Sequence, residues 1–211
     1  ENPVIEAEDP FIMEPMTARE SKGFLFRVSY YHKRIALEIF HALSDGYGGM
    51  QFLKSITYNY LLLLGKDIDS ENMILADIEC IKEEDQDSFV KNYDNSIKID
   101  RKEQKARHFK GTFYENNWVS LVSGKVKETE LKKLCNQYDC SHTQLIVACL
   151  IASAYRCSNI LDKTKHPFQV FVPVNLRRFF PSITLRNFSL YVRTKFHLDT
   201  EIPFPEIITK V

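Results

Sequence analysis

The chain has 211 residues, of which 44% are hydrophobic and 27% are charged, a composition typical of a folded globular protein. Its 28 basic and 28 acidic residues give zero formal net charge, which argues against a nucleic-acid partner. The apolar run at Leu61–Leu64 is far shorter than the ~20 residues of a membrane span, and the acidic start lacks the features of a secretory signal. We therefore predict a soluble protein without a membrane span.

Cysteine and histidine usage favours a reducing, cytoplasmic location and no metal site. The five cysteines are odd in number and none stands in a C-x-x-C pair, so neither a disulfide framework nor a zinc site is indicated. Cys149 and Cys157 lie in an apolar helical run, which predicts small buried thiols. The histidines show no metal-binding spacing.

The first predicted element after an extended lead-in, residues 1–20, is a β-hairpin. Phe24–Tyr31 is rich in aromatic and β-branched residues, and Ile35–Phe40 alternates between larger apolar and other residues. Both segments are typical of strands, and His32–Arg34 would join them.

A glycine-rich turn and a helix follow the hairpin. The turn is H-A-L-S-D-G-Y-G-G at positions 41–49, where glycine makes a bend inexpensive. Leu53, Ile56, Tyr60 and Leu64 then recur at helical spacing, and Gly65 is suited to a C-terminal cap. Residues 66–110 are crowded with charged and amide side chains, which predicts a linker.

The segment 111–157 predicts a strand and two helices. The strand lies near Trp118–Val122, and Glu128–Tyr138 has Leu131, Leu134 and Cys135 on one side of a short helix. Ser141 and Gln144 form an S-x-x-Q capping box before the apolar run Leu145–Tyr155.

Three more elements complete the chain. Phe168–Val174 is continuously apolar, which predicts a strand buried on both faces. Asn187–His197 alternates, so one of its faces would meet solvent or a cleft. Ile202–Val211 is typical of the opening of a helix.

His41 is the candidate catalytic residue, because histidine can accept and return a proton near neutral pH and this one stands where a strand meets a turn. Asp45 has two possible roles. It could fix the tautomer of His41, or it could pair with a distant arginine and hold the turn rigid, which is the role we favour.

The pattern resembles a known superfamily. A strand feeding H-A-L-S-D-G and a glycine-led helix, followed downstream by V-P-V-N-L-R-R at 172–178 and L-R-N-F at 185–188, is similar to the chloramphenicol acetyltransferase-like H-x-x-x-D-G acyltransferases. That superfamily includes nonribosomal peptide condensation domains. The V-P-V-N-L-R-R segment is most similar to that of bacterial alcohol acetyltransferases. Phe40 stands where condensation domains carry a second histidine.

The resemblance implies an α/β (α+β) fold, a two-layer sandwich of mixed sheet and helices, with this chain an incomplete portion of a two-lobe protein. Residues 1–65 would be part of the N-terminal lobe, 66–110 a linker or crossover, and 111–211 the beginning of the C-terminal lobe. Whether residues 1–211 alone catalyse a reaction stays open.

The implied activity is transfer of an acyl group from a thioester, on coenzyme A or an acyl carrier protein, to a small alcohol or amine acceptor. No cofactor would be bound permanently. His41 would be the general base, Asp45, Gly46 and Arg177 would support the site, and Tyr47 and Asn187 would bind substrate. Tyr47 could instead cover the helix start. The rival functions are a non-catalytic condensation-like binding module and a peptide condensation domain.

Overall fold

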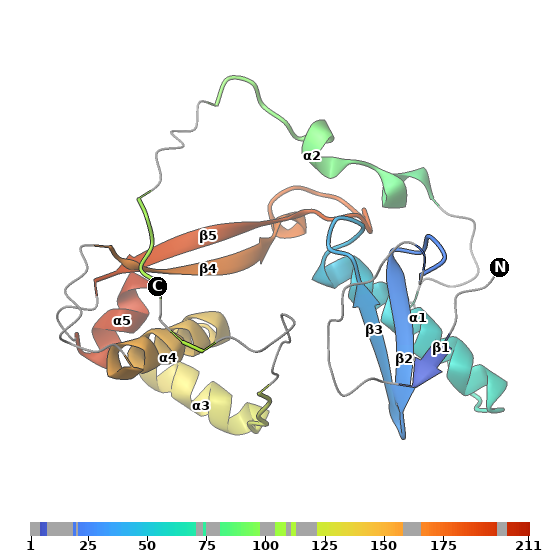
Figure 1. Ribbon diagram of the computed structural model, residues 1–211, viewed down its shortest axis with the longest axis horizontal. Coiled ribbons are helices and arrows are strands. Elements are labelled where there is room, and N and C mark those ends of the chain that lie inside the picture. The colour runs from blue at the N-terminus through green and yellow to red at the C-terminus, as the bar shows by residue number, and fades with distance from the viewer. Residues whose placement is uncertain are drawn as a thin grey trace. The chain divides into compact units, whose positions relative to one another are not determined.

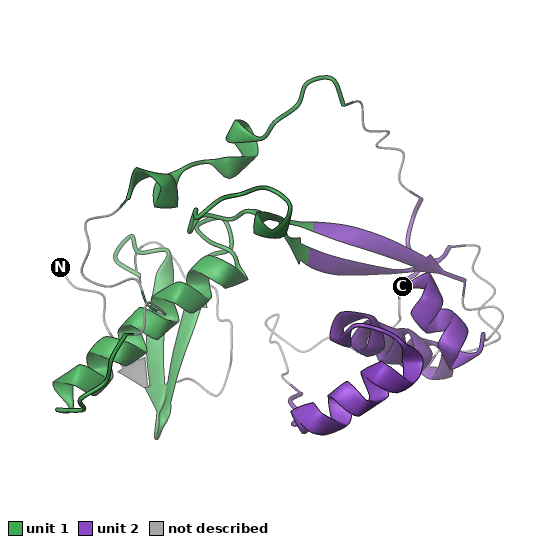
Figure 2. Cartoon of the chain, turned by 180° about the vertical axis from the view of Figure 1, so that it is seen from behind, with its two compact units in different colours: residues 1–97, 114–120, 174–190 green, residues 98–113, 121–173, 191–211 purple. Residues whose placement is uncertain are grey.

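The computed structural model describes residues 5–7, 19, 21–70, 74, 81–97, 104–108, 111–112, 122–157, 166–197 and 202–211. These form an α+β protein with one three-stranded sheet, one two-stranded sheet and helices (Figure 1). The chain separates into two compact units, each built from several chain segments (Figure 2). In the part of the chain that is described, no helix is long and apolar enough to cross a membrane.

Unit 1 contains the predicted hairpin. Strands β2 (Phe26–Tyr31) and β3 (Arg34–Ile39) pair antiparallel, and His32 at the turn takes a left-handed φ of 49°. The lead-in contributes β1 (Ile5–Ala7), which pairs parallel with β2 and makes the sheet mixed, in the order β1-β2-β3.

Helix α1 (Gly46–Leu63) packs against the sheet of unit 1 at β3. Register places Phe26 opposite Ile39 on the face that receives the helix, and the Phe26 and Phe52 rings meet edge to face with centroids 5.0 Å apart. Gly65 follows the end of the helix as predicted, and its φ of 71° turns the chain so that the Lys66 amide donates to the Leu61 carbonyl at 3.1 Å.

Two further segments complete unit 1. Residues 81–97 contain the 3-10 helix η1 (Lys82–Asp85) and the short helix α2 (Ser88–Lys91). Residues 174–190 contain the 3-10 helix η3 (Leu176–Arg178). The two segments touch through Ser88 and Ser182, whose hydroxyls are 2.7 Å apart. The predicted boundaries at 66 and 110 remain predictions, although 174–190 clusters with the N-terminal elements.

Unit 2 has the apolar core of the chain. Helices α3 (Glu128–Tyr138) and α5 (Phe204–Lys210) both pack on α4 (His142–Cys157). Strands β4 (Phe168–Asn175) and β5 (Ser189–Phe196) form the two-stranded sheet and reach from this unit into unit 1 along the chain. The centre of the core is fully buried and includes Ala148 and Ile151.

Several predictions in unit 2 hold because local signals set them. The bounds of α3 agree with the predicted helix, and the capping box is present: the Gln144 amide donates to Ser141 Oγ at 3.2 Å and the Ser141 amide donates to Gln144 Oε1 at 3.0 Å. Helix α5 lies in the segment predicted to open a helix.

Predictions of burial held less well. The β4 strand is not buried on both faces, since Phe171 is half exposed, and the apolar face of β5 is covered at Phe196 but open at Val192. On α3, Leu134 is exposed while Cys135 is buried. The predicted strand near Trp118–Val122 lies outside the described residues except for Val122, which is exposed and not in a strand.

Candidate functional site

The turn that carries the motif lies between the end of β3 at Ile39 and the start of α1 at Gly46. The Leu43 amide donates to the Phe40 carbonyl at 2.8 Å, which closes the first bend after the strand. His41 stands in this bend with its residue exposed to solvent. His41 therefore follows the end of the strand, where the sequence places it, and its role as a general base at a cleft stays a prediction.

Asp45 is the N-cap of α1 and accepts four hydrogen bonds. Its Oδ1 accepts from the amides of Tyr47 at 3.1 Å and Gly48 at 3.2 Å. Its Oδ2 accepts from the Phe188 amide at 2.9 Å and from Arg177 Nη1 at 2.7 Å. The carboxylate thus joins the helix start to the 174–190 segment and does not bond His41, so the role of holding the turn rigid is the one that the geometry matches.

The Asp45–Arg177 pair is buried, with only 4% of the aspartate side chain and 7% of the arginine side chain exposed. Burial alone disfavours the charged carboxylate and raises its pKa. The hydrogen bond from Arg177, the amides of Phe188 and Gly48 and the guanidinium charge outweigh that effect, so the pKa of Asp45 lies below its usual value. The carboxylate is therefore ionised at neutral pH and strengthens the cap.

All three nitrogens of the Arg177 guanidinium group donate hydrogen bonds. Its Nε and Nη2 donate to the Thr184 carbonyl at 3.0 and 2.7 Å, Nη2 also donates to the Arg186 carbonyl at 2.7 Å, and Nη1 lies 3.2 Å from Asn175 Oδ1. The ring of Tyr47 lies 4.6 Å from the guanidinium carbon. A planar group with fixed donors suits such a site better than lysine would.

Tyr47 therefore covers the ion pair at the helix start, which is one of the two roles predicted for it. The contact is a cation–π interaction with Arg177, and the ring remains partly exposed. Its assignment to substrate binding stays a prediction.

Sequence reasoning missed Thr184, which joins the 174–190 segment to residues 84–86 by hydrogen bonds. The residue has no exposed surface, and its hydroxyl lies 2.7 Å from the Gln86 carbonyl and 3.1 Å from the Glu84 carbonyl. The Leu185 amide also donates to Glu84 at 2.7 Å. A threonine in a polar loop gives no sequence signal for such a role, because its partners lie about a hundred residues away.

Of the glycines in the turn, Gly48 allows close approach of another backbone segment. Neither Gly46, Gly48 nor Gly49 has a positive φ, which corrects the prediction that they ease a bend. A Cβ on Gly48 would stand 2.2 Å from the Leu185 carbonyl oxygen and from Ser44 Oγ, whereas a Cβ on Gly46 would meet nothing within 4 Å. The Ser44 hydroxyl donates to that Leu185 carbonyl at 2.6 Å.

Asn187 is the neighbour of His41. Its Nδ2 lies 3.5 Å from His41 Nδ1, at the long limit for a hydrogen bond, and its Oδ1 accepts from Ser189 Oγ at 2.9 Å. Phe188, the next residue, is bonded to Asp45, so the same carboxylate that caps α1 also holds the chain beside His41. The predicted residues therefore form two linked groups, Asp45–Arg177–Tyr47 and His41–Asn187.

The contact with Asn187 affects the tautomer of His41. With Oδ1 engaged by Ser189, the amide presents Nδ2 toward Nδ1, and such a donor favours the neutral tautomer that has its proton on Nε2. Because the ring is exposed and the contact is long, solvent can exchange the two tautomers at small cost. In each neutral tautomer, the ring nitrogen without the proton is the one that can accept a proton.

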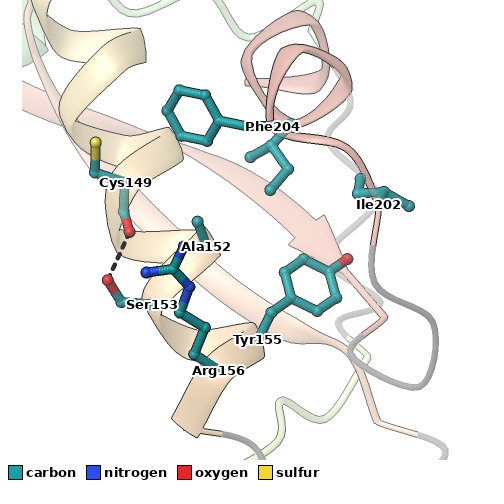
Figure 3. A pocket seen from close by; sticks show the side chains of 8 residues that line it. Cys149, Ala152, Ser153, Tyr155, Arg156, Ile202 and Phe204 are labelled. Carbon is teal, nitrogen blue, oxygen red and sulfur yellow. Dashed lines mark hydrogen bonds between the residues drawn. The ribbon is translucent and has the colours of Figure 1, made fainter.

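The exposure of two cysteines in unit 2 corrects the prediction that their thiols are buried. Cys149 and Cys157 are exposed thiols, and Cys149 lines a hollow of about 290 Å³ between α4 and α5 (Figure 3). Ser153 Oγ donates to the Cys149 carbonyl at 2.8 Å along the helix. Cys80 lies outside the described residues, among which no cluster of three metal-binding side chains occurs.

Comparison of the chain with models of protein families, with curated proteins and with solved structures finds no match.

Proposed function

We propose that the chain belongs to a chloramphenicol acetyltransferase-like acyltransferase in which His41 is the general base. The observation that supports this best is the buried ion pair of Asp45 and Arg177, 2.7 Å long, which brings the two resembling motifs together. The pair fixes the turn that presents His41 and, through Phe188, the backbone next to Asn187. This arrangement supports the positioning roles that the resemblance implies for Asp45 and Arg177.

The proposed reaction moves an acyl group from a thioester, on coenzyme A or an acyl carrier, to an alcohol or amine. A nitrogen of His41 takes the acceptor proton while the acceptor oxygen or nitrogen attacks the thioester carbonyl. The tetrahedral intermediate then expels the thiolate, which receives the proton back from the imidazolium. No acyl-enzyme is formed, and general-base assistance of this kind is worth about 10²–10⁴-fold in rate.

In this proposal, Asp45 and Arg177 are positioning residues. Both side chains are nearly inaccessible and their polar atoms are engaged with the backbone and with each other. Asn187 is the described side chain that contacts His41, so it would orient the ring or contact the acceptor.

A non-catalytic binding module is the second candidate. It is favoured by the fact that Asp45 and Gly48 serve the turn itself, whereas His41 is exposed and has one long contact with Asn187. Such a protein would bind the acyl thioester or its carrier and retain the motif for its fold.

Calorimetric titration with acetyl-coenzyme A, combined with chromatographic measurement of free coenzyme A in the presence of alcohols and amines, distinguishes the two. Chromatography is preferable to a thiol reagent because Cys149 and Cys157 are exposed and would react. Acceptor-dependent release is the expected result. Binding without release would favour the binding module, and absence of both would contradict acyl transfer by this chain.

A further inference from the structure

Unit 1 has a hollow on its sheet beside α1 that is larger than the hollow in unit 2. It has a volume of about 910 Å³ and is bounded by β2, the β2–β3 turn, the start of β3 and the length of α1 from Phe52 to Leu63. We call it the α1 groove. His41 does not line it, since the groove includes Arg34 at the start of β3, whereas His41 follows the end of that strand.

The floor and walls of the α1 groove are mainly apolar and are open to solvent. Val28, Ile35 and Ile56 line it, together with large side chains that remain exposed: Tyr30 at 52%, Tyr60 at 49% and Leu63 at 87%. Apolar surface left accessible in a concave site is unusual in a folded unit and marks a place where a ligand or partner binds.

The described charged residues that line the α1 groove are all basic. Among the described residues that line it, His32 and Lys33 lie at the turn of the hairpin and Arg34 begins β3, and none is an aspartate or glutamate. The whole chain, in contrast, has equal numbers of acidic and basic residues. The groove is therefore apolar along its length and positively charged at one end.

The polar side chains along the helix wall do not change this pattern. Thr57 Oγ1 donates to the Leu53 carbonyl at 2.8 Å, and Asn59 Nδ2 donates to the Ser55 carbonyl at 2.9 Å. These groups are satisfied within α1, so the charged end at the hairpin turn supplies the strongest polar recognition in the groove.

We propose that the α1 groove binds a small amphipathic anion, a carboxylate with an unbranched apolar chain. The chain would lie along Ile56 and Tyr60, and the carboxylate would lie near Lys33 at the hairpin turn. A volume of about 910 Å³ is within the range of about 300–1,000 Å³ typical of small-molecule sites, and a mainly apolar lining with a few polar groups is typical of them as well. The proposal does not depend on catalysis by His41.

The test is calorimetric titration of the full chain with octanoate, decanoate and dodecanoate below their micelle concentrations, with decyltrimethylammonium as the cation of matched chain length. We expect one saturable site, affinity that rises about two- to fourfold for each added methylene because more apolar surface is buried, and much weaker binding of the cation.

Two variants locate the site. Lys33→Glu should weaken decanoate binding about five- to tenfold, since it replaces an attraction with a repulsion near the carboxylate. Lys54→Glu is the matched control, because Lys54 is exposed on the same helix and does not line the groove. Tyr60→Ala should also weaken binding, whereas Tyr93→Ala, which removes an exposed ring elsewhere in unit 1, should not.

The proposal would be overturned by the absence of saturable binding, by equal affinity for the carboxylate and the ammonium, or by equal effects of Lys33→Glu and Lys54→Glu. It would also be overturned if sedimentation showed self-association that Tyr60→Ala abolishes, because the groove would then be covered by a second copy of the chain. Binding of decanoate that persists in His41→Ala separates this result from the proposed acyl transfer.

Discussion

Different kinds of interaction stabilise the interiors of the two units. The core of unit 2 consists of apolar side chains such as Ala148 and Ile151. The outer faces of its helices are exposed to solvent. The centre of unit 1 near the motif is polar: a carboxylate, a guanidinium group and a threonine hydroxyl are buried against backbone carbonyls and amides. Apolar cores adapt to modest changes, whereas a buried polar network is costly to leave partly satisfied.

The difference predicts that loss of a hydrogen bond costs more stability in the buried polar network of unit 1 than at the exposed helix surface of unit 2. In unit 1, removal of one hydrogen-bonding partner leaves another buried polar group without a partner. In unit 2, loss of a local hydrogen bond at the surface of a helix leaves solvent as a substitute.

Arg177→Met should be the most damaging of these changes. It leaves the Asp45 carboxylate buried without its cation and frees the Thr184 carbonyl, so unfolding free energy should fall by about 3–5 kcal/mol. Arg178→Met is the matched control, since Arg178 is exposed. Chemical denaturation measures both, and equal stability of the two variants would contradict the account of the ion pair.

Asp45→Asn should cost about 1.5–3 kcal/mol at neutral pH, because hydrogen bonds to a charged acceptor are lost. The cost should depend on pH. The folded pKa of Asp45 is below the unfolded value, so its stabilisation is complete above the unfolded pKa of about 3.9 and is lost as pH falls through the folded pKa.

Denaturation curves of the wild type and Asp45→Asn should therefore converge on acidification below about pH 4, the usual range for aspartate. A stability gap that stays constant from neutral to strongly acidic pH would show that the charge of Asp45 is not the stabilising feature.

Gly48→Ala should cost about 1–3 kcal/mol or more, since the new methyl group would collide with the Leu185 backbone carbonyl. Gly46→Ala, two residues earlier on the same helix, has open space and no positive φ, so it should be neutral within about 0.5 kcal/mol. Thermal melts of the pair measure the difference. Similar melting temperatures would mean that the 174–190 segment does not approach the helix start this closely.

Ser141→Ala should have the smallest effect, about 1 kcal/mol, because it removes one side-chain cap from the exposed start of α4. Ser153→Ala in the same helix also removes a hydroxyl, but alanine is the better helix former there and the Cys149 carbonyl keeps its helical surroundings. Denaturation should show a loss for the first and none for the second.

Elements set by local signals could be predicted from the sequence. The hairpin, α1 with Gly65 at its end, α3 and the capping box of α4 each depend on residues within a few positions of one another. Burial could not be predicted as well, because it depends on which neighbour covers a face. Cys149 lies in an apolar run and is nevertheless exposed.

The candidate site shows the same division. Spacing indicated His41 and Asp45, but only the resemblance to a known motif pointed to Arg177 as the partner, 132 positions along the chain from Asp45. The neighbouring sequence does not indicate that the Thr184 hydroxyl donates to the carbonyl of Gln86. It also does not indicate that Gly48 leaves space for the carbonyl of Leu185. Such contacts arise from tertiary approach of backbone segments and leave no periodic pattern.

The central claim is that His41 takes the acceptor proton in acyl transfer. The most direct measurement is the rate of acylated product formation from acetyl-coenzyme A by His41→Ala, with His142→Ala as the control for loss of an exposed histidine and circular dichroism as the control for folding. The account predicts a fall of about 10²–10⁴-fold for His41→Ala and no fall for His142→Ala. An unchanged rate in folded His41→Ala would contradict it.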